Sequence, residues 1–266
     1  MTDESKYVNN QYWYKLKTVQ SEEDVKKRRG GQLRLSDVEE LEKVCPEERR
    51  FLVEMIKSDA RIPICKVFAG HVKDLSVFDS RLGDYRFPYL EVFSCFNKNK
   101  SIPIDHQFIL NQKMLRMLYL GGIHFKSHPE LPDLSSFSDL KYLYFHFYGS
   151  NPVLAPFGNP PNLERIKVER ESGLEKLGNL GSLPSLVELD LSENAFTSLE
   201  SFANLDAPKL KKLNLNHNKI VDLCGFEPIS QFKSLEILDL SHNLVETVDA
   251  RASPPSLEKL SLDHNN

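Results

Sequence analysis

One pattern of apolar and polar residues is repeated along the carboxyl-terminal part of the chain. It reads Leu186-Val-Glu-Leu189-Asp-Leu191-Ser-Glu-Asn194, and it returns from Leu210 and again from Leu235. The leucines at positions 4 and 6 of each copy flank a polar residue, which is the two-residue period of a strand with one buried face. Because one such strand cannot bury its leucines alone, the copies are expected to stack into a parallel sheet above a continuous core.

Position 9 of each clear copy is an asparagine, where the chain has to turn sharply after the strand. A short amide bonds backbone groups that a turn leaves unpaired, and asparagine tolerates unusual dihedral angles. The sequence therefore predicts a structural asparagine ladder, in preference to a catalytic role, from Asn194, Asn218, Asn243 and Asn265.

The motif Leu-x-x-Leu-x-Leu-x-x-Asn-x-Leu resembles leucine-rich repeats. The resemblance implies an α/β solenoid with a curved parallel sheet on its concave face and short helices, 3₁₀ turns and loops on its convex face. Apolar residues spaced by three after the asparagine, such as Phe196, Leu199 and Phe202, favour 3₁₀ turns or short helices there. In pattern the chain is most similar to the intracellular subclass that includes the leucine-rich regulatory subunit of type-1 protein phosphatase, although its repeats are longer.

The register can be followed toward the amino terminus through less regular copies. About eight copies result, clearest over residues 186–266, with first positions at Leu90, Leu115, Leu140, Leu163, Leu186, Leu210, Leu235 and Leu257. Ile62, Cys65 and Val67 form a degenerate ninth candidate. Because the early copies lack the asparagine, we expect less regular turns there. The proline-rich residues 151–161 predict an extended connection on the convex side.

Three segments are predicted along the chain: an irregular one over 1–35, a helical amino-terminal cap over 36–61 and the solenoid over 62–266. Ser36 and Glu39 form a capping box, and Pro46 suits the first turn of a second helix. Repeat arrays need a cover over the open end of their core. A small independent interaction domain is the alternative for the cap.

Composition narrows the class of protein. Of 266 residues, 40% are apolar and 27% are charged, and the formal net charge of −4 argues against general nucleic-acid binding. We expect no membrane partner, because no apolar run approaches a membrane span. Four scattered cysteines favour reduced thiols and an intracellular location, cytoplasmic or alternatively nuclear. No catalytic motif is present, so a non-enzymatic protein without cofactors is predicted.

Two groups of side chains stand out on the predicted concave face. The first is an exposed aromatic patch, predicted to bind a partner, of Phe96, Met117, Tyr119, Tyr142 and Tyr144. The amino-terminal segment folding over this patch is the alternative. The second is a charged band that would orient the partner, formed by Arg165, Lys167, Glu188 and Asp190. Ordinary pairing of these charges across neighbouring strands is its alternative.

Three histidines at position 8, His217, His242 and His264, are expected to stack on consecutive strands. No cysteine or carboxylate completes a ligand shell with them, so no metal site is predicted. The sequence thus predicts a scaffold that binds another protein through its concave sheet. The alternatives are a regulatory or targeting subunit of a phosphatase, and the repeat platform of a larger protein whose effector domain is absent here. End-to-end association through the last repeat is also possible, because its strand edge is unpaired.

Overall fold

The chain separates into two units, residues 1–43 and residues 44–266. A computed structural model describes parts of the second unit, namely residues 44–57, 64–68, 71–78, 86–96, 106–124, 132–148, 153–154, 156–169, 173–223, 227–248 and 253–266. The predictions for the irregular segment and for the first helix of the cap lie outside these residues.

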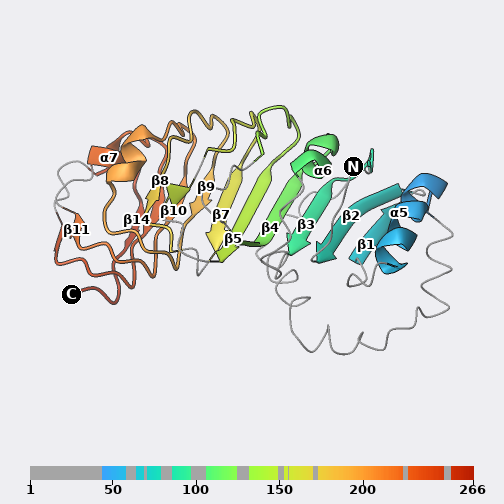
Figure 1. Cartoon of the computed structure of the whole chain (residues 1–266). Helices are drawn as coiled ribbons and strands as arrows, with labels where there is room; N and C mark the ends of the chain where they lie inside the picture. The colour runs from blue at the N-terminus through green and yellow to red at the C-terminus, as the bar shows by residue number, and fades with distance from the viewer. Residues whose placement is uncertain are drawn as a thin grey trace. The chain divides into compact units, whose positions relative to one another are not determined.

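A ten-stranded sheet runs through the second unit in the order β1-β2-β3-β4-β5-β7-β9-β10-β12-β14 (Figure 1). Its last eight strands are the eight predicted copies, β3 (Val92–Phe96), β4 (Met117–His124), β5 (Tyr142–Tyr148), β7 (Arg165–Glu169), β9 (Glu188–Asp190), β10 (Lys212–Asn214), β12 (Ile237–Asp239) and β14 (Lys259–Ser261). Neighbours among them are parallel, and equal repeat positions face each other up to position 7, as in Met117 beside Tyr142 and Glu188 beside Lys212. The predicted register and solenoid are confirmed.

The degenerate ninth copy was placed wrongly. β1 (Ile64–Phe68), which contains Cys65 and Val67, is antiparallel to β2 (His71–Phe78). The two strands are separated by two residues, and so short a connection joins antiparallel strands, because a parallel pair needs a crossover of a dozen or more residues. β2 instead pairs in parallel with β3, with Leu75 opposite Phe93.

Strand length depends on whether a copy has an asparagine at position 9. The copies that carry it have strands of three residues, whereas β4 has eight and β5 has seven. Where the side chain that closes the turn is replaced by Ile123 or Tyr148, pairing continues through position 9, with an irregularity between Gly121 and Ile123. The predicted irregularity of the early copies is confirmed at β4.

Short elements form the layer opposite the sheet. They include the helices α6 (His106–Asn111) and α7 (Glu227–Ser230), the 3₁₀ helix η1 (Glu200–Asn204), and two small parallel sheets made by β6 (Val153–Leu154) with β8 (Lys176–Leu177) and β11 (Asp222–Leu223) with β13 (Thr247–Val248). The predicted mixture of short helices and 3₁₀ turns is confirmed, with strand pairs added to it. β6 is the extended part of the proline-rich connection.

The second helix of the predicted cap is α5 (Pro46–Lys57), which begins at the expected proline. Phe51 and Leu52 are each 1% exposed. The Phe51 ring lies 5.0 Å from Phe87 and 6.3 Å from Phe108, measured between ring centroids. These aromatic contacts anchor the helix to the first rungs of the core.

Candidate protein-binding surface

The predicted aromatic patch is not exposed. Four of its members are buried, with 3% exposure for Met117, 2% for Tyr119, 8% for Tyr142 and 3% for Tyr144. The Tyr119 and Tyr144 rings stack with centroids 4.2 Å apart. The side chain of Phe96 and the amino-terminal segment that was the alternative cover lie outside the described part of the chain.

The exposure prediction failed because it assumed one solvated sheet face along the whole array. Ser94, which occupies the same face of β3, is also 0% exposed, so the sheet is buried on both faces here. The signal was present in the sequence, because Met117 to Leu120 and Tyr142 to Phe145 are unbroken apolar runs. Such runs are typical of strands buried on both faces, whereas alternation is typical of half-exposed ones.

The face opens to solvent from β7 onward. The side chains at positions 3 and 5 of four strands are exposed or half-exposed, and we call them the concave strip: Arg165, Lys167, Glu188, Asp190, Lys212, Asn214, Ile237 and Asp239. The predicted charged band is therefore the accessible part of the predicted site, and the aromatic residues beside it are not.

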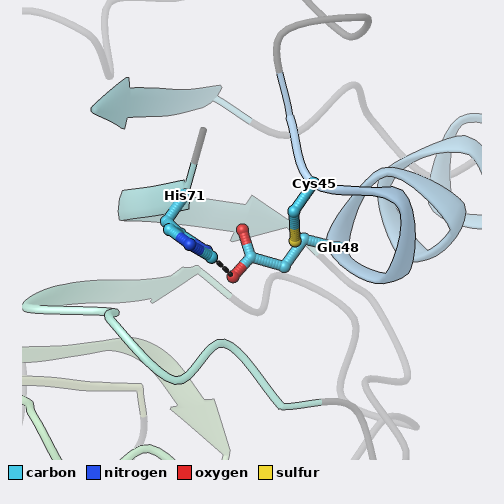
Figure 2. A group of neighbouring side chains, drawn as sticks. All are labelled: Cys45, Glu48 and His71. Carbon is cyan, nitrogen blue, oxygen red and sulfur yellow. Dashed lines mark hydrogen bonds and ion pairs between the residues drawn. The ribbon is translucent and has the colours of Figure 1, made fainter. Parts of the chain in front are cut away.

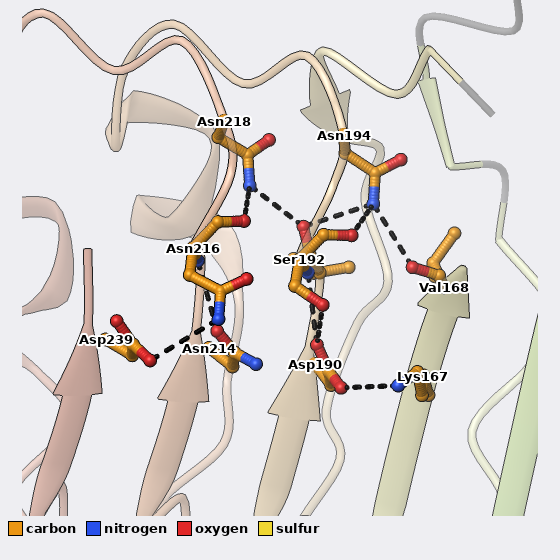
Figure 3. Close-up of polar contacts among 10 residues, drawn as sticks. Lys167, Val168, Asp190, Ser192, Asn194, Asn214, Asn216, Asn218 and Asp239 are labelled. Atoms are coloured by element: carbon orange, nitrogen blue, oxygen red, sulfur yellow. Dashed lines mark hydrogen bonds and ion pairs between the residues drawn. The ribbon is translucent and has the colours of Figure 1, made fainter. Parts of the chain in front are cut away.

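Ion pairs cross between the first two strands of the concave strip. Arg165 Nε lies 3.4 Å from Glu188 Oε2. Lys167 Nζ lies 3.0 Å from Asp190 Oδ2, and Figure 3 shows this second pair. The Arg165 guanidinium also lies 5.8 Å from the Tyr142 ring centroid, a cation–π contact with the buried aromatic half. Pairing across strands, which was the alternative interpretation of the band, is thus observed, and it holds the charges in fixed columns.

The acidic and amide residues at position 5 also shape the ends of their strands. Asp190 Oδ1 accepts hydrogen bonds from the backbone N–H of Ser192 at 3.1 Å and from its hydroxyl at 2.7 Å. Asp239 repeats both contacts with Ser241, at 3.0 and 2.6 Å. One carboxylate oxygen is therefore engaged in the turn, and the side chain keeps a defined orientation at the surface.

The asparagine ladder that the sequence predicts lies beyond the carboxyl ends of the strands that carry the strip (Figure 3). Asn218 Nδ2 donates to the carbonyl oxygens of Leu191 and Leu215, both at 3.0 Å, and its Oδ1 accepts the Phe196 N–H at 3.0 Å. Asn243 makes the equivalent bonds one rung later. Each amide thereby joins its own rung to the preceding one, which fixes the spacing between neighbouring strands at their carboxyl ends.

The three position-8 histidines stack as expected. Their ring centroids are 4.0 Å apart for His217 and His242 and 4.2 Å apart for His242 and His264. All three have positive φ angles of 53–58°, in the left-handed region. The pKa of His242 lies below its ordinary value of 6.5, first through partial desolvation and then through the charges of both neighbours, while Asp239 and Asp263 act in the opposite direction.

No helix among the described residues is long and apolar enough to cross a membrane.

Comparison with known proteins agrees with the repeats. Family models described as leucine rich repeat match residues 185–205 and 208–266. Over 77 residues the chain is 43% identical to acidic leucine-rich nuclear phosphoprotein 32 family member A from Drosophila pseudoobscura pseudoobscura, which is 29% of this chain and 29% of that protein. It is 43% identical over 84 residues to an uncharacterized leucine-rich repeat-containing protein from Schizosaccharomyces pombe, covering 32% of this chain and 13% of that one.

Solved structures show the same fold. An internalin-like protein from Listeria monocytogenes superposes with a TM-score of 0.50 at 18% identity, over 84% of this chain and 66% of its own. The leucine-rich repeat domain of APL1B also gives 0.50, at 17% identity, over 84% of this chain and 74% of its own. The resemblance to the phosphatase-subunit subclass stays a prediction.

Proposed function

We propose, from the premise that this chain is a leucine-rich-repeat protein, that it is a non-enzymatic scaffold whose concave strip binds another protein. The observation that carries the proposal is the change of the sheet face at β7. Before this strand the described face is buried, and from β7 to β12 every side chain at positions 3 and 5 reaches solvent.

The chemistry of the strip favours a protein over a nucleic acid. Its cations are Arg165, Lys167 and Lys212, and the strip has an equal number of carboxylates, Glu188, Asp190 and Asp239. A nucleic acid would need a surplus of cations to replace its counterions. Alternating columns of charge beside the half-exposed Ile237 suit a protein partner with complementary columns.

The buried aromatic residues support this surface without belonging to it. Tyr142 backs Arg165, and Tyr144 lies opposite Lys167 in the adjacent strand. A rigid backing reduces the conformational entropy that the two long cations lose on binding. We therefore place the binding surface on the charged half of the array and exclude the aromatic residues from it.

The first test reverses one ion pair on the strip. Tagged full-length chain carrying Lys167→Glu with Asp190→Lys keeps the pair but inverts its field, and recovered proteins are quantified by mass spectrometry. The matched control is Lys141→Glu with Glu164→Lys, a pair of the same 3.0 Å length that lies just before the strands. We expect partners to be depleted at least about tenfold by the first swap and retained by the second. If both variants recover equal amounts of the partner proteins and their unfolding midpoints are unchanged, the concave strip is not the binding surface.

The location of the protein is also proposed from its relatives. The relative from Drosophila pseudoobscura pseudoobscura is described as a nuclear phosphoprotein, which favours the nucleus. The scattered cysteines of this chain favour a reducing compartment, either the nucleus or the cytoplasm. Fluorescence imaging of a tagged full-length chain distinguishes the two compartments, and a secreted product would contradict the placement.

A further inference from the structure

Three metal-ligating side chains converge where α5 meets β2, away from the concave strip. Cys45, Glu48 and His71 each bring one ligand atom to within 4.8 Å of the other two. Figure 2 shows the Glu48 carboxylate between the Cys45 sulfur and the His71 ring. We propose that these residues form a site for a divalent transition-metal ion of the zinc class.

The helix start positions two of the ligands. Cys45 immediately precedes α5, and its carbonyl oxygen accepts the Arg49 N–H at 2.9 Å, so it is the cap residue. Glu48 follows three residues later, and cap and third-position side chains lie beside each other at a helix start. The start of α5 alone therefore places a thiol and a carboxylate side by side, without any contribution from β2.

The strand supplies the third ligand and the support for the second. Glu48 is 2% exposed, and its Oε2 accepts the Val72 N–H at 2.8 Å. That bond orients the carboxylate, as outer hydrogen bonds do for metal ligands. His71, which begins β2, has its ring centroid 4.3 Å from that of Tyr89, and this contact restricts the orientation of the imidazole.

The donor set suits zinc better than it suits the alternatives. Thiolate, imidazole and carboxylate are the three protein ligands of zinc, with bonds of about 2.0–2.3 Å, and together the two anions balance a divalent charge. The His71 Nδ1 to Glu48 Oε1 distance is 3.3 Å, longer than the roughly 2.7–2.9 Å of a strong charge-assisted bond. Small movements of the half-exposed His71 and Cys45 side chains would bring the ligands to bonding distance.

A nucleophilic cysteine is the rival interpretation of the same three residues. In a cysteine–histidine–acid arrangement the imidazole stands between the thiol and the carboxylate, because it takes the proton from sulfur. Here the carboxylate holds the middle place. A proton-transfer chain would therefore be in the wrong order, whereas three ligands around one ion need no such order.

The experiment titrates Zn²⁺ alone into the metal-stripped full-length chain by calorimetry, with Co²⁺ as the spectroscopic probe for thiolate ligation. We expect one ion per chain, a thiolate-to-cobalt charge-transfer band, weaker binding at lower pH and a higher unfolding midpoint with metal. Cys45→Ser and His71→Gln should each weaken binding by more than about 100-fold, because changes outside the ligand shell alone cost about 10–100-fold. Serine is a good helix cap, so Cys45→Ser keeps the helix start.

Two control variants separate this site from other donors in the chain. Cys224→Ser removes a thiol elsewhere in the sequence, and His242→Gln interrupts the histidine stack. Both should bind Zn²⁺ like the unaltered chain. Absence of one-to-one binding, or binding that survives Cys45→Ser and His71→Gln but is lost in His242→Gln, would overturn the proposal.

Discussion

Replacing Asn218 by alanine tests whether the asparagine ladder stabilises the repeats to the degree that its contacts imply. The side chain is 7% exposed, and its Oδ1 is the acceptor for the buried Phe196 N–H. Its two strongest donated bonds go to carbonyl oxygens that keep a second amide donor, because Leu191 also accepts from Asn194 and Leu215 from Asn243. The amide of Phe196 is therefore the group that the substitution leaves without its side-chain partner.

The magnitude follows from these contacts. One buried unsatisfied N–H costs about 1–3 kcal/mol, and the two donated bonds contribute about 0.5 kcal/mol each when their acceptors keep other donors. We expect Asn218→Ala to lower the free energy of unfolding by about 2–4 kcal/mol. Asn216→Ala, two residues away and half-exposed, should cost no more than about 0.5 kcal/mol.

The assay is urea unfolding of both variants followed by circular dichroism, with hydrogen exchange of the Phe196 amide as the local reading. A lower midpoint at an unchanged slope, together with faster exchange at Phe196, is the expected result. The reasoning is refuted by an Asn218→Ala variant that unfolds within about 0.5 kcal/mol of Asn216→Ala. Slow exchange at Phe196 in the variant would show that another acceptor replaces the amide.

Three further results are expected. Gly158→Ala should lower the unfolding midpoint by the equivalent of about 1–3 kcal/mol, because φ is +81° and the added Cβ would lie 2.1 Å from Asp133 Oδ1; an unchanged midpoint contradicts this. As pH falls below 6.5, the unfolded chain takes up a proton at His242 before the folded chain does, so stability should decrease, and pH-dependent unfolding of His242→Gln should show a flatter profile. A double-mutant cycle on Lys167 and Asp190, each changed to alanine, should give a coupling of about 0.2–1 kcal/mol that weakens with salt, since both side chains are part-exposed; a coupling above about 3 kcal/mol would mean that the pair is effectively buried.

The parallel array and its register were predictable because they depend on a local, repeated pattern. Leucines at positions 4 and 6 lie in the core wherever a copy has a neighbour on both sides, and Leu189, Leu213 and Leu238 are at most 1% exposed. In the last copy, Leu260 is 37% exposed. The ladder was predictable for the same reason, since each asparagine bonds only its own rung and the preceding one. The repeated pattern therefore predicts the contacts that recur between neighbouring repeats, namely the strand register, the leucine core and the asparagine bonds.

The failures lie where neighbouring repeats differ from one another. The concave positions of β4 and β5 were expected to be exposed by analogy with the later copies, although Tyr119 and Tyr144 lie in unbroken apolar runs. The β1–β2 hairpin was mistaken for a repeat, because Cys65 and Val67 match its spacing over too few residues to distinguish the two. Glu48 and His71 are 23 residues apart in the sequence, and the β1–β2 hairpin brings His71 back to Glu48. A motif of closely spaced residues could therefore not have predicted their contact.

Because of these differences, substitutions in β3 to β5 and in β7 to β12 are expected to have different effects. In β3 to β5 both described sheet faces are buried, so a substitution on either face acts on packing, and Tyr119→Ala should cost about 3–5 kcal/mol as a core truncation does. In β7 to β12 one face carries half-exposed charges, where an exchange such as Lys212→Ala changes stability by no more than about 0.5 kcal/mol. Under the proposed function, residues of the strip can change without loss of the fold, because the asparagine ladder at the carboxyl ends of these strands supplies rigidity that the surface residues do not.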